Sequence, residues 1–324
     1  MDRMQIKKRR LGNTDIEISK LGFGAWAMGG LNYGKVDKNE SIEAVKAYID
    51  AGGNHIDTAR MYGESEEILG KIFKDKAISD QIILASKTYF GEKMDQISLI
   101  ERDLETSLKK LNRDYLDIYY LHIPPDDEET MHAALDELQR LKKRGFIRTV
   151  GASIKAANVS THTVDLSRQY IASGKVDVLM LVYSIFRQMN EEIFSESYDA
   201  GIGIVARTAL ESGFLTGKFL PGHRFRENDH RARWGEKRLD RIFTEVNELQ
   251  KILVEPPYET LGQVALKFAI SDPRISSLIV GAVNKDMVYS NINPIWMPPL
   301  SHEVLSEIKR FKDKTELYNL GEDE

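Results

Sequence analysis

The segment NHIDTARMYG (residues 54–63) carries a carboxylate and a phenol five positions apart, directly after a short run with β-strand character. The pattern places Asp57 at the end of the predicted strand and Tyr62 on the loop beyond it. Two later predicted strands end in Lys87 and His122. Because the ends of parallel strands converge on one face of a barrel, these four side chains predict a single proton-donating active site.

The same kind of short β-branched or apolar run recurs along the chain. Eight such runs span residues 22–26, 54–58, 82–86, 116–121, 149–153, 176–182, 203–206 and 277–280. Continuous apolar runs are typical of strands that are buried on both faces. Between most of them, apolar residues follow helical spacing, as in Ile97, Ile100, Leu104, Leu108 and Leu111 or in Met131, Ala134, Leu135, Leu138 and Leu141. Alternating strands and helices in a chain of this length predict a closed (β/α)8 TIM barrel.

An open, doubly wound sheet is the alternative arrangement of alternating strands and helices. A dinucleotide site in such a sheet requires a G-x-G-x-x-G turn after the first strand. The first predicted strand instead leads into GAWAMGG (residues 24–30), which lacks that spacing. We therefore interpret these glycines as part of an ordinary turn and favour the barrel.

Two further segments are predicted to lie at opposite ends of the barrel. Residues 5–19 read as a β-hairpin with a turn at residues 12–15, and we expect it to cap the bottom of the barrel. A long connection after the seventh strand contains a polar stretch from Pro221 to Gly235, which is a candidate loop at the active face. Without a linker or an internal sequence repeat, residues 1–324 are expected to form one domain.

Composition restricts the partners of the protein. The formal net charge is -5 without a block of one sign, which disfavours nucleic acid or an anionic membrane and favours a small-molecule partner. The chain has no Cys and no apolar run near the roughly 18 to 20 residues of a membrane helix. Since the first residues also lack the apolar core of a signal peptide, we expect a cytoplasmic protein. The oligomeric state is not specified by the sequence.

Beyond these patterns, the sequence resembles the aldo-keto reductase family, of the bacterial NADP-dependent type, over essentially its full length. The matching segments are residues 21–24, 57–59, 62–63, 150–153 and 212–218, together with Lys87 and His122. This resemblance implies a barrel with a catalytic tetrad of Asp57, Tyr62, Lys87 and His122. It also implies a nicotinamide cofactor that binds in an extended form without a Rossmann fold.

Physical chemistry supports these four roles independently. Hydride addition to a carbonyl creates negative charge on oxygen, which an acid must neutralise. Tyr62 is the candidate acid, and a phenol donates its proton more readily beside an ammonium, which Lys87 would supply. A buried Lys needs a carboxylate to stay charged, and Asp57 is placed for that role. His122 would donate a hydrogen bond to the substrate oxygen.

At the nicotinamide, the resemblance implies several contacts and shows several departures. Ser153 matches the family Ser that binds the carboxamide, but Ile154 replaces the usual Asn and Met180 replaces the usual Gln. Arg207 stands where an aromatic residue commonly stacks on the ring. Its planar guanidinium is suited to the same stacking, and a surface or substrate-facing charge is the alternative.

For the rest of the cofactor, the resemblance assigns residues in two regions. Thr208, Leu210 and Ser212 match positions that meet the pyrophosphate, and Lys218 matches a Lys near the phosphates. Near the adenosine, Gly281 and Met287 stand where a basic or amide side chain could bind a 2'-phosphate, and Asn291 matches. Lys285, Lys218 or the arginines of the long loop are left to compensate. The complete predicted cofactor set is Gly24, Trp26, Asp57, Ser153, Met180, Arg207, Thr208, Leu210, Ser212, Lys218, Gly281, Lys285, Met287 and Asn291. Because members of the resembled family commonly use NADP(H), the resemblance favours NADP(H) as the cofactor, with NAD(H) as the alternative.

The predicted substrate is an aldehyde or ketone with apolar substituents. The wall of its pocket is expected from Trp26, Met28, Tyr33, Met61, Tyr89 and Phe90. Neither the physiological substrate nor the reaction direction follows from the sequence. One alternative is a nicotinamide-binding sensor subunit with negligible turnover. Another is a metal-dependent hydrolase, because His55 and Asp57 share a strand face, but a third ligand is missing and we predict no metal.

Overall fold

Eight parallel strands close into a barrel in the computed structural model of the chain, which describes residues 5–30, 36–154 and 159–311. They are β3 (Leu21–Gly24), β4 (His55–Asp57), β5 (Ile83–Thr88), β6 (Leu116–Leu121), β7 (Ile147–Ser153), β8 (Val178–Val182), β9 (Gly203–Arg207) and β10 (Ile275–Gly281). The last strand pairs with the first, with Leu278 opposite Leu21 and Gly281 opposite Gly24. The closed barrel confirms the predicted fold and excludes the open sheet.

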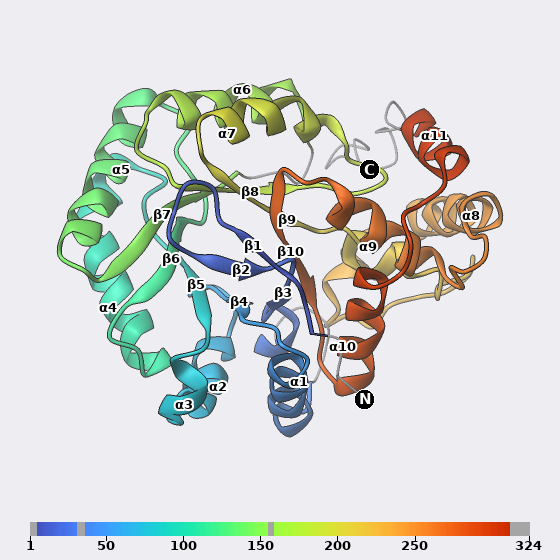
Figure 1. The fold of residues 1–324 in the computed structure, drawn as a ribbon, viewed down its shortest axis with the longest axis horizontal. Helices are drawn as coiled ribbons and strands as arrows, with labels where there is room; N and C mark the ends of the chain where they lie inside the picture. The colour runs from blue at the N-terminus through green and yellow to red at the C-terminus, as the bar shows by residue number, and fades with distance from the viewer. Residues whose placement is uncertain (1–4, 31–35, 155–158, 312–324) are drawn as a thin grey trace.

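Helices surround the barrel, as Figure 1 shows. They are α1 (Lys38–Asp50), α2 (Ser65–Ile72), α3 (Lys76–Ser79), α4 (Ile100–Leu111), α5 (Glu128–Lys143), α6 (Thr161–Ala172), α7 (Phe194–Asp199), α8 (Glu236–Leu253), α9 (Leu261–Ser271), α10 (Lys285–Ile292) and α11 (His302–Arg310). Short 3-10 helices are η1 (Ala27–Gly29), η2 (Met94–Leu99), η3 (Met189–Ile193), η4 (Glu211–Thr216), η5 (His230–Arg233) and η6 (Asn293–Ile295).

The predicted apolar faces are the faces that the helices bury. In α4 the buried side chains include Ile100, Leu104, Leu108 and Leu111, whereas Ile97 lies on the preceding η2 and is only partly buried. In α5 all five predicted residues are buried. The apolar period therefore located both helices and oriented them correctly toward the strands.

The N-terminal hairpin closes the lower end of the barrel. Its strands β1 (Lys8–Arg10) and β2 (Glu17–Ser19) are antiparallel, and in Figure 1 they lie across the barrel strands. Leu11, Ile16 and Ile18 pack with Tyr120 and Met180 in the apolar cluster inside the barrel. Because the hairpin fills one end with apolar side chains, polar chemistry is confined to the other end, where the strands terminate.

His55 is one of the buried polar side chains in the lower part of the barrel. Its side chain is 0% exposed, and its Nδ1 lies 2.9 Å from the Ser277 hydroxyl. Burial lowers the pKa of His55 to about 3, and the positive charge of Lys87 acts in the same direction. His55 is therefore neutral in the folded protein throughout the neutral range.

Because His55 is neutral in the folded protein, we expect the fold to lose stability in acid. In the unfolded chain His55 binds a proton near its ordinary pKa of 6.5, whereas in the folded chain it does so only near pH 3. The contribution of neutral His55 to the free energy of unfolding is therefore fully present above pH 6.5, and it falls as the pH drops from 6.5 toward 3. Between pH 7 and pH 5 the expected loss from His55 is about 2 kcal/mol. Urea unfolding at both pH values measures it.

The matched control for this effect is His55→Gln, which removes the titrating group. Its unfolding free energy should depend less on pH than that of the wild type, by about the same 2 kcal/mol. An equal pH dependence in both proteins would show that His55 does not contribute.

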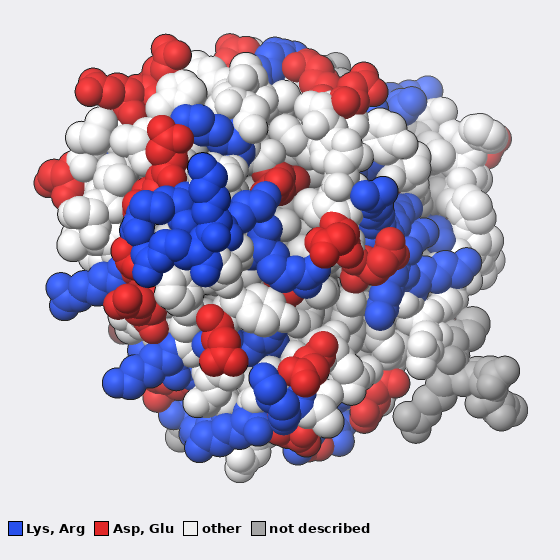
Figure 2. Space-filling view, turned by 60° about the vertical axis from the view of Figure 1, so that its left-hand side comes forward, with Lys and Arg blue, Asp and Glu red and all other residues white. Residues whose placement is uncertain are grey.

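The surface carries both signs of charge. Figure 2 shows a group of Lys and Arg side chains on one face with Asp and Glu side chains beside it. Many charged surface residues form ion pairs. For example, Arg140 and Arg144 both contact Glu101, and Lys142 lies 2.6 Å from Asp177. Within the described parts of the chain, every helix is too short or too polar to cross a membrane.

Candidate active site

The structure places a buried ion pair at the upper end of the barrel. Asp57 ends β4, and Lys87 lies near the end of the neighbouring β5. The Lys87 Nζ donates to both carboxylate oxygens of Asp57 at 2.7 Å and to the carbonyl of Thr58 at 2.8 Å. The two side chains are 1% and 4% exposed, so these acceptors hold the ammonium in one position away from bulk water.

Tyr62 and His122 lie beside this pair. The Lys87 Nζ is 4.8 Å from the centre of the Tyr62 ring, and the rings of Tyr62 and His122 are 5.6 Å apart at an angle of 81°. Tyr62 is on the loop after β4, and His122 directly follows β6. The structure thus brings together all four residues that the sequence predicted for the catalytic centre.

The electrostatics of the site keep His122 neutral. Burial lowers the pKa of His122 to about 3, and the positive charges of Lys87 and Arg207 add to this effect. Burial also raises the pKa of Asp57, while the Lys87 ammonium opposes that change. The His122 Nδ1 is buried without a hydrogen-bond partner among the described residues. A neutral imidazole with one nitrogen that makes no hydrogen bond within the protein is suited to a hydrogen bond with a ligand.

A second charged cluster, which the sequence reasoning missed, fixes the loop that carries Tyr62. Arg60 donates from Nε to Asp103 of α4 at 2.8 Å, and its Nη1 lies 3.6 Å from Glu66 of α2. Asp103 also accepts from the backbone of Tyr89 on the loop after β5. The only sequence signal was that Asp103 and Glu66 occupy the apolar faces of their helices, where an unpaired charge is costly.

The turn after β9, residues 208–213, has an unusual backbone. Thr208, Glu211 and Ser212 have φ angles of +68°, +48° and +55°. Residues with a Cβ rarely adopt this left-handed region, and such strain is concentrated at ligand-binding sites. Leu210 lies in the same turn, and its carbonyl accepts from Gly213 and Leu215. The predicted pyrophosphate residues therefore share one strained turn, which we call the β9 turn.

A buried ion pair holds the β9 turn in place. Glu211 is 1% exposed and accepts from Arg187 Nε at 2.9 Å as well as from Arg187 Nη2. The Ser184 hydroxyl donates to the same carboxylate and accepts from the Arg187 backbone. Arg187 and Ser184 belong to the loop after β8, so two neighbouring loops are locked to each other. The pair lies outside the residues that the sequence assigned to the site.

Arg207 ends β9 and faces the catalytic residues. Its Nη1 lies 3.4 Å from the Thr208 hydroxyl, and its Nη2 lies 3.4 Å from the Ile154 carbonyl. In the barrel, Ser153 pairs with Met180, and Met180 is 1% exposed within the inner apolar cluster. The three positions predicted for the nicotinamide thus occupy adjacent strands β7, β8 and β9.

The long loop (residues 221–235) reaches across the upper face. The His230 ring is 4.8 Å from the Trp26 ring, and its Nε2 lies 3.4 Å from the Ser212 hydroxyl. Arg231 donates to the Ser212 carbonyl at 3.2 Å. The loop therefore connects the segment after β3 with the β9 turn, as expected for a loop at the active face.

The predicted adenosine residues surround the start of α10. Lys285 is bound by Glu43 of α1 at 2.9 Å, and Asn291 donates to the Gly281 carbonyl at 3.1 Å. Met287 is 37% exposed, and Lys218 is exposed after the β9 turn. These contacts leave Lys285 with an acidic partner that an incoming phosphate would have to replace.

Gly24 and Gly281, both predicted to contact the cofactor, lie side by side where β3 pairs with β10. Gly24 lies opposite Gly281, and a Cβ at Gly24 would meet the Ile279 side chain at 2.8 Å. A larger residue at Gly24 would therefore require the Ile279 side chain to shift. The packing of the Ile279 side chain against Gly24 explains a Gly at this strand end.

The predicted substrate wall is only partly observed. Met61 and Tyr89 are exposed, and the rings of Tyr89 and Phe90 are 5.2 Å apart. Met28 is 2% exposed and packs in the core instead, and Tyr33 lies outside the described residues. For metal binding, the described residues contain no group of three or more His, Asp or Glu side chains suited to an ion.

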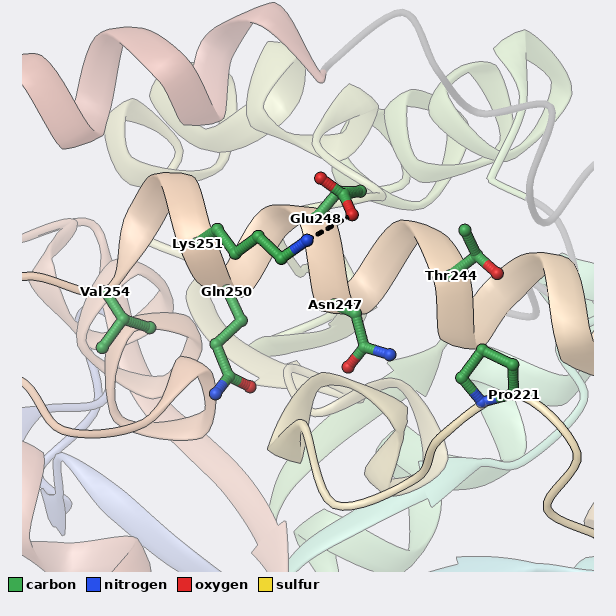
Figure 3. Close-up of a pocket in the computed structure, with 7 residues that line it drawn as sticks. All are labelled: Pro221, Thr244, Asn247, Glu248, Gln250, Lys251 and Val254. Atoms are coloured by element: carbon green, nitrogen blue, oxygen red, sulfur yellow. Dashed lines mark hydrogen bonds and ion pairs between the residues drawn. The ribbon is translucent and has the colours of Figure 1, made fainter.

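A separate groove of about 590 Å³ runs along α8, as Figure 3 shows. It is lined by Pro221, Thr244, Asn247, Glu248, Gln250, Lys251 and Val254. Glu248 and Lys251 are 2.7 Å apart within it. None of its lining residues lies at a barrel strand end, so the groove is distinct from the candidate active site.

A comparison with known families matches residues 20–313 to the aldo/keto reductase family. The chain belongs to that family. This aldo-keto reductase is an NAD(P)H-dependent oxidoreductase, and its barrel is the fold that the resemblance predicted.

Known relatives agree in sequence and in structure. The aldo-keto reductase YhdN of Bacillus subtilis is 31% identical over 84% of this chain and 83% of that protein. The NADH-specific methylglyoxal reductase of Escherichia coli is 30% identical over 89% of this chain and 93% of its own length. The holo form of aldo-keto reductase AKR11C1 from Bacillus halodurans superposes with a TM-score of 0.75 at 25% identity, covering 95% and 96% of the two chains.

Proposed function

We propose that this aldo-keto reductase uses NADP(H) to transfer hydride between the nicotinamide and the carbonyl carbon of an aldehyde or ketone, with Tyr62 as the proton donor. The observation that carries the proposal is the ammonium of Lys87, held by Asp57 and 4.8 Å from the Tyr62 ring. A cation in this position stabilises negative charge on the phenolic oxygen as the proton leaves.

In this mechanism, each of the four residues has a separate task. The bound nicotinamide supplies the hydride when a carbonyl is reduced. Tyr62 gives its phenolic proton to the carbonyl oxygen, and in the oxidation direction it takes the proton back. Asp57 keeps Lys87 charged and oriented, and the neutral His122 donates a hydrogen bond that orients the substrate oxygen.

The strand ends fit a nicotinamide cofactor. Arg207 Nε and His122 Nδ1 are buried polar atoms without hydrogen-bond partners in the described residues, which is a cost that a bound ligand can remove. The strained β9 turn supplies backbone groups for a pyrophosphate. We assign Ser153, Met180 and Arg207 to the nicotinamide, Thr208, Leu210, Ser212 and Lys218 to the phosphates, Gly281, Lys285, Met287 and Asn291 to the adenosine, and Gly24 and Trp26 to the adjoining wall.

The direct test is turnover. Purified protein with NADPH and a panel of aldehydes, diketones and keto esters should show loss of absorbance at the nicotinamide band. Absence of turnover on the whole panel would contradict the proposal. We further propose that the chain acts as one domain in the cytoplasm, in line with its single barrel and its lack of Cys.

Cofactor preference gives a separate prediction. We expect NADPH to bind tighter than NADH, because Lys285 can exchange Glu43 for a 2'-phosphate, although the relative from Escherichia coli is named as NADH-specific. Lys285→Met should weaken NADPH binding by about three- to tenfold and leave NADH binding unchanged. Fluorescence titration with both cofactors measures the dissociation constants.

Lys46→Met is the matched control for Lys285→Met. Lys46 also contacts Glu43, at 3.0 Å, but it belongs to α1 rather than to the predicted adenosine residues. Its removal should leave both affinities unchanged. Tighter binding of NADH than of NADPH by the wild type would overturn the NADP(H) assignment.

A nicotinamide-binding sensor subunit is the second candidate function. The observation in its favour is that Ile154 and Met180 are buried apolar residues where the family commonly places amides that hold the carboxamide. A loosely held ring would slow hydride transfer. Tight cofactor binding together with immeasurably slow single-turnover transfer would favour the sensor over the reductase.

A further inference from the structure

Arg207 is partly buried at the upper barrel face, and unlike the buried cations Lys87 and Arg187 it lacks a carboxylate partner. Lys87 is bound by Asp57, and Arg187 is bound by Glu211. For Arg207, no Asp or Glu of the described residues lies within ion-pair distance, and its two hydrogen bonds go to neutral oxygens at 3.4 Å. The guanidinium of Arg207 is therefore not paired directly with a carboxylate.

This charge is also fixed in position and partly shielded from water. Arg207 is the last residue of β9, and it pairs with Val182 on one side and Ile279 on the other. Its Nε is buried, and its guanidinium lies between the Ile154 carbonyl after β7 and the Thr208 hydroxyl. A charge held on a barrel strand in a low-dielectric setting acts on its neighbours more strongly than an exposed one.

The charge of Arg207 acts electrostatically on the catalytic residues. It is one of the causes that lower the pKa of His122. Burial lowers the pKa of Arg207 itself, and the charges of Tyr62 and Asp57 partly oppose that change. These mutual effects place the guanidinium within electrostatic range of the position where hydride transfer occurs under the proposed function.

The two redox forms of a nicotinamide differ in charge at the ring. The oxidised ring is a cation, and the reduced ring is neutral. A fixed cation beside the ring repels the first form and leaves the second unaffected, whereas an aromatic residue at the same position would favour the cationic ring. The identity of the residue at the end of β9 therefore decides which redox form is bound more tightly.

We propose that Arg207 makes this site discriminate between the two redox forms of its cofactor, so that it binds the reduced form preferentially. This inference rests on the proposed function, because it requires a nicotinamide at these strand ends. It adds a determinant of the relative affinity for the two redox forms, which the proposed chemistry alone leaves open.

The test compares the dissociation constants of NADPH and NADP⁺, measured by quenching of intrinsic Trp fluorescence, in the wild type and in two variants. Arg207→Met keeps an extended side chain without charge, and Arg207→Lys keeps the charge. For the wild type we expect NADP⁺ to bind about 10- to 100-fold more weakly than NADPH. Arg207→Lys should keep this ratio, and Arg207→Met should lower it by about tenfold or more.

Other outcomes separate failure of the inference from failure of the function. If Arg207→Met weakens both forms equally, or if both variants change the ratio alike, Arg207 acts through stacking or packing and the inference is wrong. If the wild type binds neither form, the proposed function fails as well. Arg207→Gln serves as a second uncharged variant should Arg207→Met not fold, and it must show the same lowered ratio.

Discussion

Tyr62→Phe should lower kcat with an aldehyde substrate by about 100- to 10,000-fold, the usual contribution of a positioned general acid. The substitution removes only the phenolic oxygen and keeps the ring that packs 5.6 Å from His122. Binding of NADPH should therefore be unchanged, since the loss is confined to proton transfer. Steady-state kinetics and a cofactor titration on the same preparation measure both quantities.

Tyr120→Phe is the matched control for Tyr62→Phe. Tyr120 is fully buried inside the barrel, its ring centre is 5.8 Å from the Lys87 Nζ, and its hydroxyl has no hydrogen-bond partner in the described part of the chain. Its removal costs no hydrogen bond and should leave kcat nearly unchanged. Equal activity of Tyr62→Phe and the wild type would exclude Tyr62 as the proton donor.

Asp57→Asn should destabilise the fold and abolish most activity. It leaves the Lys87 ammonium buried beside a neutral amide, and removal of one partner from a buried ion pair typically costs about 3–5 kcal/mol of unfolding free energy. A buried ammonium without its carboxylate also loses its proton more readily, so Tyr62 loses the neighbouring charge. Urea unfolding and kcat measure the two effects.

Lys87→Met and the double variant with Asp57→Asn complete this experiment. Lys87→Met leaves a buried carboxylate unpaired and should cost a similar amount of stability. The double variant contains neither charge, so it should be more stable than either single variant while staying inactive. Additive losses of stability in the double variant would show that the two side chains do not act as a pair.

The sequence located the barrel strands to within a few residues. Strand 116–121 was predicted with its observed bounds, and the predicted strand at 277–280 is extended at both ends in β10. Apolar runs report burial on both faces of a parallel strand, and the helical period reports the buried face of α5, so both are encoded locally. Strand ends are less sharply encoded, because the last ladder bonds depend on the neighbouring strand.

The site was predicted to the extent that its residues lie at strand ends. Asp57 and Lys87 could be assigned in this way, because the fold itself brings strand ends to one face. The ion pairs that hold the loops around the site could not be predicted from the sequence. Arg60 and Asp103 are 43 positions apart, and Arg187 and Glu211 are 24 positions apart, so their pairing depends on how separate loops and helices pack.

By itself, the sequence determined the alternation of strands and helices, the closed barrel and the residue types at its upper end. The pairing of Asp57 with Lys87 was also predicted from the sequence. Only the tertiary structure decided the other pairs of buried charges: it fixed the β9 turn through Glu211 and Arg187 and left Arg207 without a carboxylate. The physical reason is that burial follows from local periodicity, whereas the partner of a buried charge depends on the three-dimensional meeting of distant segments.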